Sequence, residues 1–187
     1  VLQMAQPAKL STALGNRLFD YRSHQKKEMR TSDIVISTEK AQLDIDYIHN
    51  FLATSYWSEG IPKHAVEKSI QNSFCFGMYE SRKQIGFARV ITDFTTFAYL
   101  ADLFIDESQR GKGLGKKLVH EIITHEKLEG LKRWHLVTAD AQSLYSQYGF
   151  AVPEDPSRHM EKRVKPKHWG ADSKACSTLK LPITRPR

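Results

Sequence analysis

The sequence predicts a mixed α/β (α+β) fold, in which one twisted, mostly antiparallel sheet carries helices on its faces. The prediction rests on the order in which strand-like and helix-like segments follow one another. Segments typical of strands are interspersed with segments whose apolar residues recur at helical spacing, in the order β-α-α-β-β-β-α-β-α-β. The chain has 187 residues, of which 40% are hydrophobic and 26% are charged. These values fit a single globular domain with a sizeable core.

One strand and two helices are expected first. The run DIVIST, residues 33–38, alternates and is rich in β-branched residues, which is typical of a strand. The run AQLDIDYIHNFLATSYW has apolar residues at helical spacing and Asp44 near its start, so it predicts an amphipathic helix. In the run IPKHAVEKSIQNS, Pro62 suits the first turn of a second helix.

Three strand-like runs then follow one another, namely SFCFGMYE, QIGFARVITD and FAYLADLFID. The polar break SRKQ between the first two indicates a tight connection, so we expect an antiparallel meander. No internal repeat interrupts this order.

The second half is expected to alternate helices and strands. A glycine-rich turn leads into the helix GLGKKLVHEIITHEKL, and the strand RWHLVTA follows at 133–139. The run AQSLYSQYGF predicts a helix with Asp140 as its N-cap and Gly149 at its C-terminal end. A last short strand is expected at HMEKRV.

The charge is distributed unevenly along the chain, whose net charge is +7. Residues 1–30 carry six basic and two acidic side chains, residues 151–187 carry nine and four, and residues 31–150 carry 13 and 15. We therefore expect an N-terminal extension over 1–30, a folded domain over 31–164 and a basic C-terminal arm over 165–187. Basic ends can bind polyanions, so a nucleic-acid-binding module is an alternative. The domain has no basic stripe with interleaved aromatics, which disfavours that alternative.

Composition also disfavours membrane and metal-dependent functions. No apolar run approaches the roughly 18–20 residues of a membrane span. Cys75 and Cys176 are far apart and lack metal-ligand spacing, so we expect no metal and a reducing, cytoplasmic location. Cys75 lies in a strand-like run without an activating partner and is expected to be a buried packing residue.

The turn before the long helix combines three glycines with basic residues, in the stretch DESQRGKGLGKKLVHEII. A nucleotide P-loop is excluded because Arg110 stands where its first glycine would be and no hydroxyl follows Lys116. The first amides of a helix bind anions, and glycines let a phosphate approach the backbone. The turn therefore predicts a phosphate-binding site, and a plain surface turn is the alternative.

The run from Arg110 to Gly115 resembles the R/Q-x-x-G-x-G/A motif of the GNAT family of N-acetyltransferases. The run LYSQYGF, about thirty residues later, resembles that family's LY-x-x-x-GF segment. The resemblance covers about residues 33–164. With WSEGIP early and T-x-DA-x-x-LY late, the chain is most similar to small bacterial-type members of unassigned acceptor. Thr138 stands where the family often has Asn, which weakens any cofactor contact there.

The resemblance implies acetyl-CoA as the donor and two parallel strands, YLADLFI and RWHLVTA, that splay apart around it. It implies that backbone groups of the turn bind the pyrophosphate and that the preceding strand pairs with the pantetheine arm. The residues so implied are Leu103, Phe104, Ile105, Arg110, Gly111, Lys112, Gly113, Leu114, Gly115 and Lys116.

The family motif implies Tyr145 as the acid that protonates the leaving thiolate; packing on the helix face, with the hydroxyl bonded elsewhere, is the alternative. Asp102 is the candidate base, because a carboxylate in an apolar strand is costly to bury unless it is bonded or used. A partnered structural carboxylate is the alternative. In that family the loop between the first two helices usually borders the acceptor site, so Trp57 and Glu59 are candidates for binding the acceptor, and an aromatic ring beside a carboxylate suits a cationic amine. Phe94, in the turn before the central strand, is a further candidate. A Trp57 that only anchors one helix on the sheet is the alternative.

These expectations describe a GNAT-type acyl-CoA N-acyltransferase that moves an acetyl group to an amine, expected to be that of a small molecule, by direct attack in a ternary complex. A catalytically silent acyl-CoA-binding domain is a further alternative. The sequence leaves open the acceptor, the length of the acyl group and the choice between a monomer and a homodimer.

Overall fold

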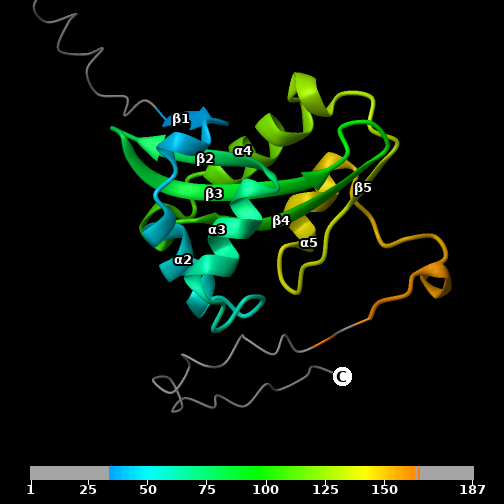
Figure 1. The fold of residues 1–187 in the computed structure, drawn as a ribbon. Coiled ribbons are helices and arrows are strands. Elements are labelled where there is room, and N and C mark those ends of the chain that lie inside the picture. Colours follow the sequence, from blue (N-terminus) through cyan, green and yellow to red (C-terminus); the bar gives the residue numbers. More distant parts are fainter. Residues whose placement is uncertain (1–33, 163, 165–187) are drawn as a thin grey trace, which may run out of the picture. The chain divides into compact units, whose positions relative to one another are not determined.

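The computed structural model describes residues 34–162 and 164 (Figure 1). Its sheet has five strands in the order β1-β2-β3-β4-β5. The strands are β1 (Ile34–Ser37), β2 (Phe74–Glu80), β3 (Lys83–Thr92), β4 (Phe97–Ile105) and β5 (Arg133–His135). Strands β2, β3 and β4 pair antiparallel, whereas β5 runs parallel to β4. The predicted mixed, mostly antiparallel sheet and its meander are therefore confirmed.

All four expected helices are present but shorter than the predicted runs, and β5 covers only the first part of the strand predicted at 133–139. The helices are α2 (Ile45–Thr54), α3 (Lys63–Gln71), α4 (Leu114–Ile123) and α5 (Gln142–Tyr145). The Asp44 carboxylate accepts the Tyr47 N–H and caps α2. Pro62 is the N-cap of α3 and so stands one position before the first turn. A 3₁₀ turn over Ser146–Tyr148 continues α5, and Gly149 ends it at φ 82°, as predicted.

Helices α2 and α3 cover one face of the sheet and α4 covers the other (Figure 1). Successive strand residues point to opposite faces, and β2 illustrates the division. Cys75 packs with Ile48 and Val66 from the two helices. Its neighbours Phe74 and Phe76 instead place their rings 5.0 and 5.5 Å from that of His125, just after α4.

Two local predictions are wrong. Residues 159–162 of the run HMEKRV form no strand, although His159 stacks on His135 of β5 at 5.9 Å. Asp140 does not cap α5. Ala141 is the N-cap, and the Thr138 hydroxyl accepts the Ala141 N–H at 3.0 Å. The expected extension over 1–30 and the arm over 165–187 lie outside the described residues.

The α2–α3 face of β2 contains a buried hydroxyl that lacks a partner. Tyr79 is 7% exposed, and its hydroxyl makes no hydrogen bond within the described part of the chain. The ring folds back over Gly77, where an added Cβ would collide with the hydroxyl and ring atoms of Tyr79. An unbonded buried hydroxyl is destabilising because it has lost its water without gaining a partner.

We expect Tyr79→Phe to raise the free energy of unfolding by about 1 kcal/mol, because it removes this desolvated group. Burial also raises the pKa of Tyr79 to about 12. Its folded pKa therefore exceeds its unfolded one, so the protein loses stability as the pH rises from about 10 toward 12. The Tyr79→Phe variant should lose less stability over this pH range. Urea unfolding at pH 7 and pH 11 measures the gain at neutral pH and the smaller loss at high pH. As a control, Tyr148→Phe removes a bonded hydroxyl and should destabilise; an equal loss in both variants would contradict the prediction.

Candidate active site

The two parallel strands separate partway along β4. They pair at Phe97, Ala98 and Tyr99, the last opposite His135, and β5 then ends. From Leu100 to Ile105, β4 continues without a strand partner on that side among the described residues. The opposite edge of β4 carries a bulge, where one residue of β3 faces two residues of β4 and Asp102 has φ 53°. The backbone of the second half of β4 is thus not paired with β5.

The glycine-rich turn follows β4 directly and starts α4. Gly111 and Gly113 have φ values of 79° and 77°, in the left-handed region that favours glycine. Gly113 is the N-cap of α4 and provides no side-chain cap. The first backbone bond of the helix runs from the Lys117 N–H to the Gly113 carbonyl. The preceding amides at the start of this ten-residue helix can therefore bind an anion.

The space above the turn is open. A Cβ added at Gly111 or Gly113 would meet no atom within 4 Å, and one at Gly115 would only touch Leu144 at 3.7 Å. Two basic side chains of the turn make local contacts. Lys112 donates to the Gln109 side chain at 2.6 Å, and Arg110 lies 3.6 Å from Glu107 in an exposed ion pair.

An open cleft of about 590 Å³ lies where the end of α2, the end of β4 and the loop after β5 meet. Its lining combines aromatic, acidic, basic and hydroxyl side chains. The lining residues are Phe51, Thr54, Ser55, Tyr56, Trp57, Asp106, Glu107, Arg110 and Asp140. Arg110 belongs to the glycine-rich turn, so the cleft adjoins the predicted phosphate site. The predicted acceptor residue Trp57 lies in it, whereas Glu59 does not.

Aromatic contacts tie one wall of the cleft to the core. Phe51 stacks on Phe104 of β4 at 3.8 Å with an interplanar angle of 7°. Trp57 lies 6.5 Å from Phe51 and 4.9 Å from Tyr56, edge to face in the second case. These contacts hold the start of the α2–α3 loop against the sheet.

The Tyr56 hydroxyl joins the two sides of the cleft. It accepts the Ala139 N–H at 3.2 Å and lies 3.3 Å from Oδ1 of Asp140, to which it donates. Both partners belong to the loop between β5 and α5. The sequence does not predict this contact, because Tyr56 and Asp140 are 84 positions apart.

Tyr145 lies at the end of α5 and is 9% exposed. Its ring packs edge to face on Phe150 at 5.9 Å. Burial raises the pKa of Tyr145 to about 12, with smaller contributions from Tyr56 and Asp140, which line the cleft. Within residues 34–162 no side chain or backbone group bonds its hydroxyl, whereas the hydroxyl of Tyr148 donates to the Lys116 carbonyl at 2.7 Å.

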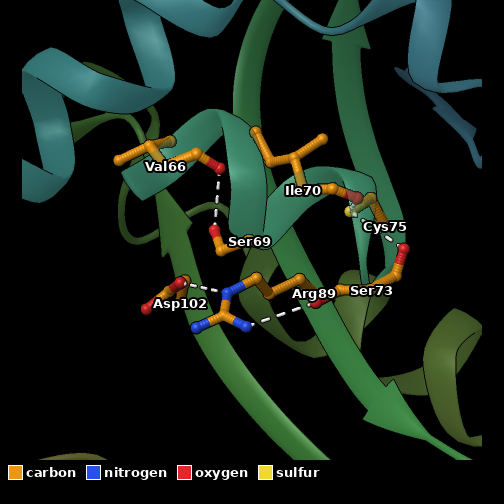
Figure 2. Close-up of polar contacts among 7 residues, drawn as sticks. All are labelled: Val66, Ser69, Ile70, Ser73, Cys75, Arg89 and Asp102. Atoms are coloured by element: carbon orange, nitrogen blue, oxygen red, sulfur yellow. Dashed lines mark hydrogen bonds and ion pairs between the residues drawn. The ribbon is translucent and has the colours of Figure 1, made fainter. Parts of the chain in front are cut away.

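Asp102 is already bonded to another side chain. Its carboxylate accepts a hydrogen bond from Nε of Arg89, and Nη1 of Arg89 also donates to Ser73 at 3.3 Å (Figure 2). The Asp102 and Arg89 side chains are 8% and 17% exposed, and neither lines the cleft. This geometry agrees with the structural alternative for Asp102 and gives no support to a base.

Phe94 does not reach the cleft either. It lies in the turn between β3 and β4, with φ 59°, and its ring contacts Phe74 at 5.6 Å. The nine residues of β4 separate that turn from Asp106, which lines the cleft. At about 3.3 Å for each strand residue, this is too far for Phe94 to share a small acceptor with Trp57.

Cys75 is buried, and burial raises the pKa of its thiol to about 11. Its Sγ lies 3.6 Å from the carbonyls of Ile70 and Ser73 (Figure 2). It therefore fits the packing role expected for it. Among the described residues, no group of three or more His, Cys, Asp or Glu side chains is arranged to hold a metal ion. None of the helices in this part of the chain is both long and apolar enough to span a membrane.

Comparison with known families and proteins gives one consistent assignment. A family model described as an acetyltransferase (GNAT) domain matches residues 71–152, from the end of α3 through α5. An inferred acetyltransferase of Gibberella zeae is 30% identical over 138 residues, which are 62% of this chain and 77% of that protein.

Solved structures agree with this family assignment. An inferred GNAT-family acetyltransferase from Xanthomonas campestris pv. campestris is 41% identical with a TM-score of 0.69, over 71% of this chain and 94% of that one. A predicted acetyltransferase from Clostridium acetobutylicum, solved with acetyl-CoA, is 14% identical with a TM-score of 0.53, over 70% and 95% of the two chains. The second similarity is one of fold.

Proposed function

Because the chain belongs to the GNAT family of acetyltransferases, which take the acetyl group from acetyl-CoA, we propose that it acetylates the amine of a small molecule by direct attack in a ternary complex. The observation that carries the proposal is the uncapped start of α4 beside the cleft. Open backbone amides there suit a pyrophosphate, and the cleft leaves room for an acceptor next to it.

The donor is assigned to the turn and to the unpaired edge of β4. Amides from Arg110 through Lys116 would hold the pyrophosphate, and Arg110 and Lys112 would add positive charge. The backbone of Leu103 to Ile105 would pair with the pantetheine arm, because this part of β4 has no β5 partner. The residues present fit such a ligand, since a phosphate needs the space that a Cβ would take at Gly111 and Gly113.

Acetyl transfer needs an uncharged amine, a thioester carbonyl and a proton for the departing thiolate. The amine attacks the carbonyl carbon, a C–N bond forms and the C–S bond breaks. We assign the proton for the thiolate to the Tyr145 hydroxyl, whose raised pKa keeps it protonated. After the attack, the acceptor nitrogen releases its extra proton to solvent, and a proton from solvent restores the hydroxyl of Tyr145. The ammonium form of the acceptor loses its first proton to water in the open cleft.

We expect Gly113→Ala to weaken acetyl-CoA binding at least about tenfold, because the added methyl group takes the place of a phosphate contact worth roughly 1.5 kcal/mol or more. Isothermal titration with acetyl-CoA measures the effect. Gly130→Ala is a matched control, because Gly130 also has φ 77° and open space around its Cβ position. Both variants carry the same backbone strain, but Gly130 lies in the turn before β5.

Equal affinities in the Gly113 and Gly130 variants would contradict the assignment of the donor to this turn. A wild-type protein that binds a short DNA duplex but not acetyl-CoA would favour the polyanion-binding alternative. Acetyl-CoA binding without turnover of any amine would favour the silent acyl-CoA-binding domain. Turnover kinetics that require both substrates to be bound together would support the ternary complex.

A further inference from the structure

The cleft is acidic in a chain with a net positive charge. Three carboxylates line it, from Asp106, Glu107 and Asp140, against a single guanidinium, that of Arg110. We propose that the acceptor is a cationic amine that carries no carboxylate or phosphate group, bound between Asp140 and the rings of Tyr56 and Trp57. This inference rests on the proposed function and names the class of acceptor for the same site.

Of the three carboxylates, that of Asp140 lies beside the aromatic rings and has no cationic partner in the described part of the chain. Asp106 accepts bonds from the backbone and hydroxyl of Ser108 at 3.0 and 2.6 Å. Glu107 forms an ion pair with Arg110. Asp140 receives the Tyr56 hydroxyl at 3.3 Å and the Thr138 hydroxyl at 3.5 Å, both at Oδ1. Its Oδ2 is given no partner by residues 34–162, so it can accept a charged N–H donor.

The aromatic side chains beside Asp140 suit a cation as well. Tyr56 and Trp57 line the cleft and are 59% and 42% exposed, although both are large and partly apolar. Their rings stand at 82° to each other, so they present faces in two directions. A cation over an aromatic face is attracted by the ring quadrupole. The Tyr56 hydroxyl meanwhile fixes the Asp140 carboxylate next to these rings.

Tyr145 is the last residue of α5, which begins two residues after Asp140. Its hydroxyl has no bonding partner in the described part of the chain. The subsite and the group assigned to protonate the thiolate therefore belong to one short segment of the chain. An acceptor with its own carboxylate or phosphate would bring a like charge toward Asp140, which is unfavourable.

Pairs of compounds that differ by one carboxylate test the inference. We would measure kcat/KM with saturating acetyl-CoA for tyramine against tyrosine, cadaverine against lysine and agmatine against arginine. At least one decarboxylated amine should be acetylated, with kcat/KM at least about tenfold above that of its amino acid, as expected for one charge-assisted contact. The preference should shrink as salt is added, because the subsite is exposed to solvent.

Two variants test whether Asp140 causes the preference for the decarboxylated amine. Asp140→Asn should lower kcat/KM for the decarboxylated amine by roughly tenfold, mainly through KM, and leave acetyl-CoA affinity unchanged. Glu129→Gln removes one negative charge at an exposed position outside the cleft and should leave the preference as it is. If the two variants behave alike, the preference comes from the general field of the protein and the subsite assignment is wrong.

The remaining outcomes separate this inference from the proposed function. If the amino acids are acetylated as well as the amines, the cationic acceptor is overturned and the proposed function stands. If none of the six compounds reacts while acetyl-CoA still binds, the cationic acceptor and the proposed transfer are both contradicted, as expected for a silent acyl-CoA-binding domain. If acetyl-CoA does not bind to the wild-type protein, the proposed function itself fails.

Discussion

Tyr145→Phe should lower kcat by roughly 10²–10³-fold while acetyl-CoA affinity stays unchanged. The loss has the size expected when one positioned proton donor is removed. The ring can keep its contact with Phe150, because phenylalanine differs only by the hydroxyl. In the variant the thiolate must take its proton from water. Steady-state kinetics together with titration of acetyl-CoA separate loss of chemistry from loss of binding.

The dependence of kcat on pH tests the role of Tyr145 as proton donor in a second way. Burial is the main cause that raises the pKa of Tyr145 to about 12. The hydroxyl therefore remains protonated up to pH 10. At pH values up to 10, kcat of the wild-type protein should not decrease through deprotonation of this acid.

Tyr79→Phe is the control for both measurements, because Tyr79 lies in β2, does not line the cleft and also has a pKa raised to about 12 by burial. It should keep the rate. A Tyr145→Phe protein with full kcat, or equal losses of rate in both variants, would assign the proton to another group.

The fold and the glycine-rich turn before α4 could be predicted because their signals are local. The β2–β4 meander follows from continuous strand-like runs joined by short turns. The start of α4 follows from glycines and basic residues within one stretch of chain, and the positive φ values at Gly111 and Gly113 account for that spacing. The parting of β4 and β5 was implied by the family resemblance, and the short pairing of these strands agrees with it.

The cleft could be predicted only in part, because its contacts are distant in sequence. Trp57 was found from an aromatic residue beside an acid, but that acid, Glu59, does not line the cleft, whereas Asp140 and two other carboxylates do. Spacing alone gave Asp140 a capping role, but Ala141 is the N-cap of α5 and the helix has no side-chain cap. The predicted strand HMEKRV also needed more than a pattern, since a strand forms only where a partner offers backbone groups.

The Arg89–Asp102 pair is another contact that the sequence did not predict, and its removal should strongly lower the stability of the protein. We expect Asp102→Asn to lower the free energy of unfolding by about 3 kcal/mol, because it leaves a mostly buried guanidinium without its counter-charge. Asparagine tolerates the left-handed conformation about as readily as aspartate does, so the φ of 53° at this position adds little strain. Denaturant unfolding measures the loss directly.

An exposed pair provides the comparison. Lys63 and Asp46 lie 2.6 Å apart, but their side chains are 45% and 74% exposed. Asp46→Asn should therefore have much less effect than Asp102→Asn, because solvent screens the charge that remains. The contrast also separates structure from catalysis at Asp102. If Asp102→Asn were as stable as the wild-type protein yet inactive, with the acidic limb of its pH–rate profile lost, Asp102 would be a base after all. A large loss of stability, with activity retained in the fraction that stays folded, means that the carboxylate holds the β4 bulge beside the point where the strands part.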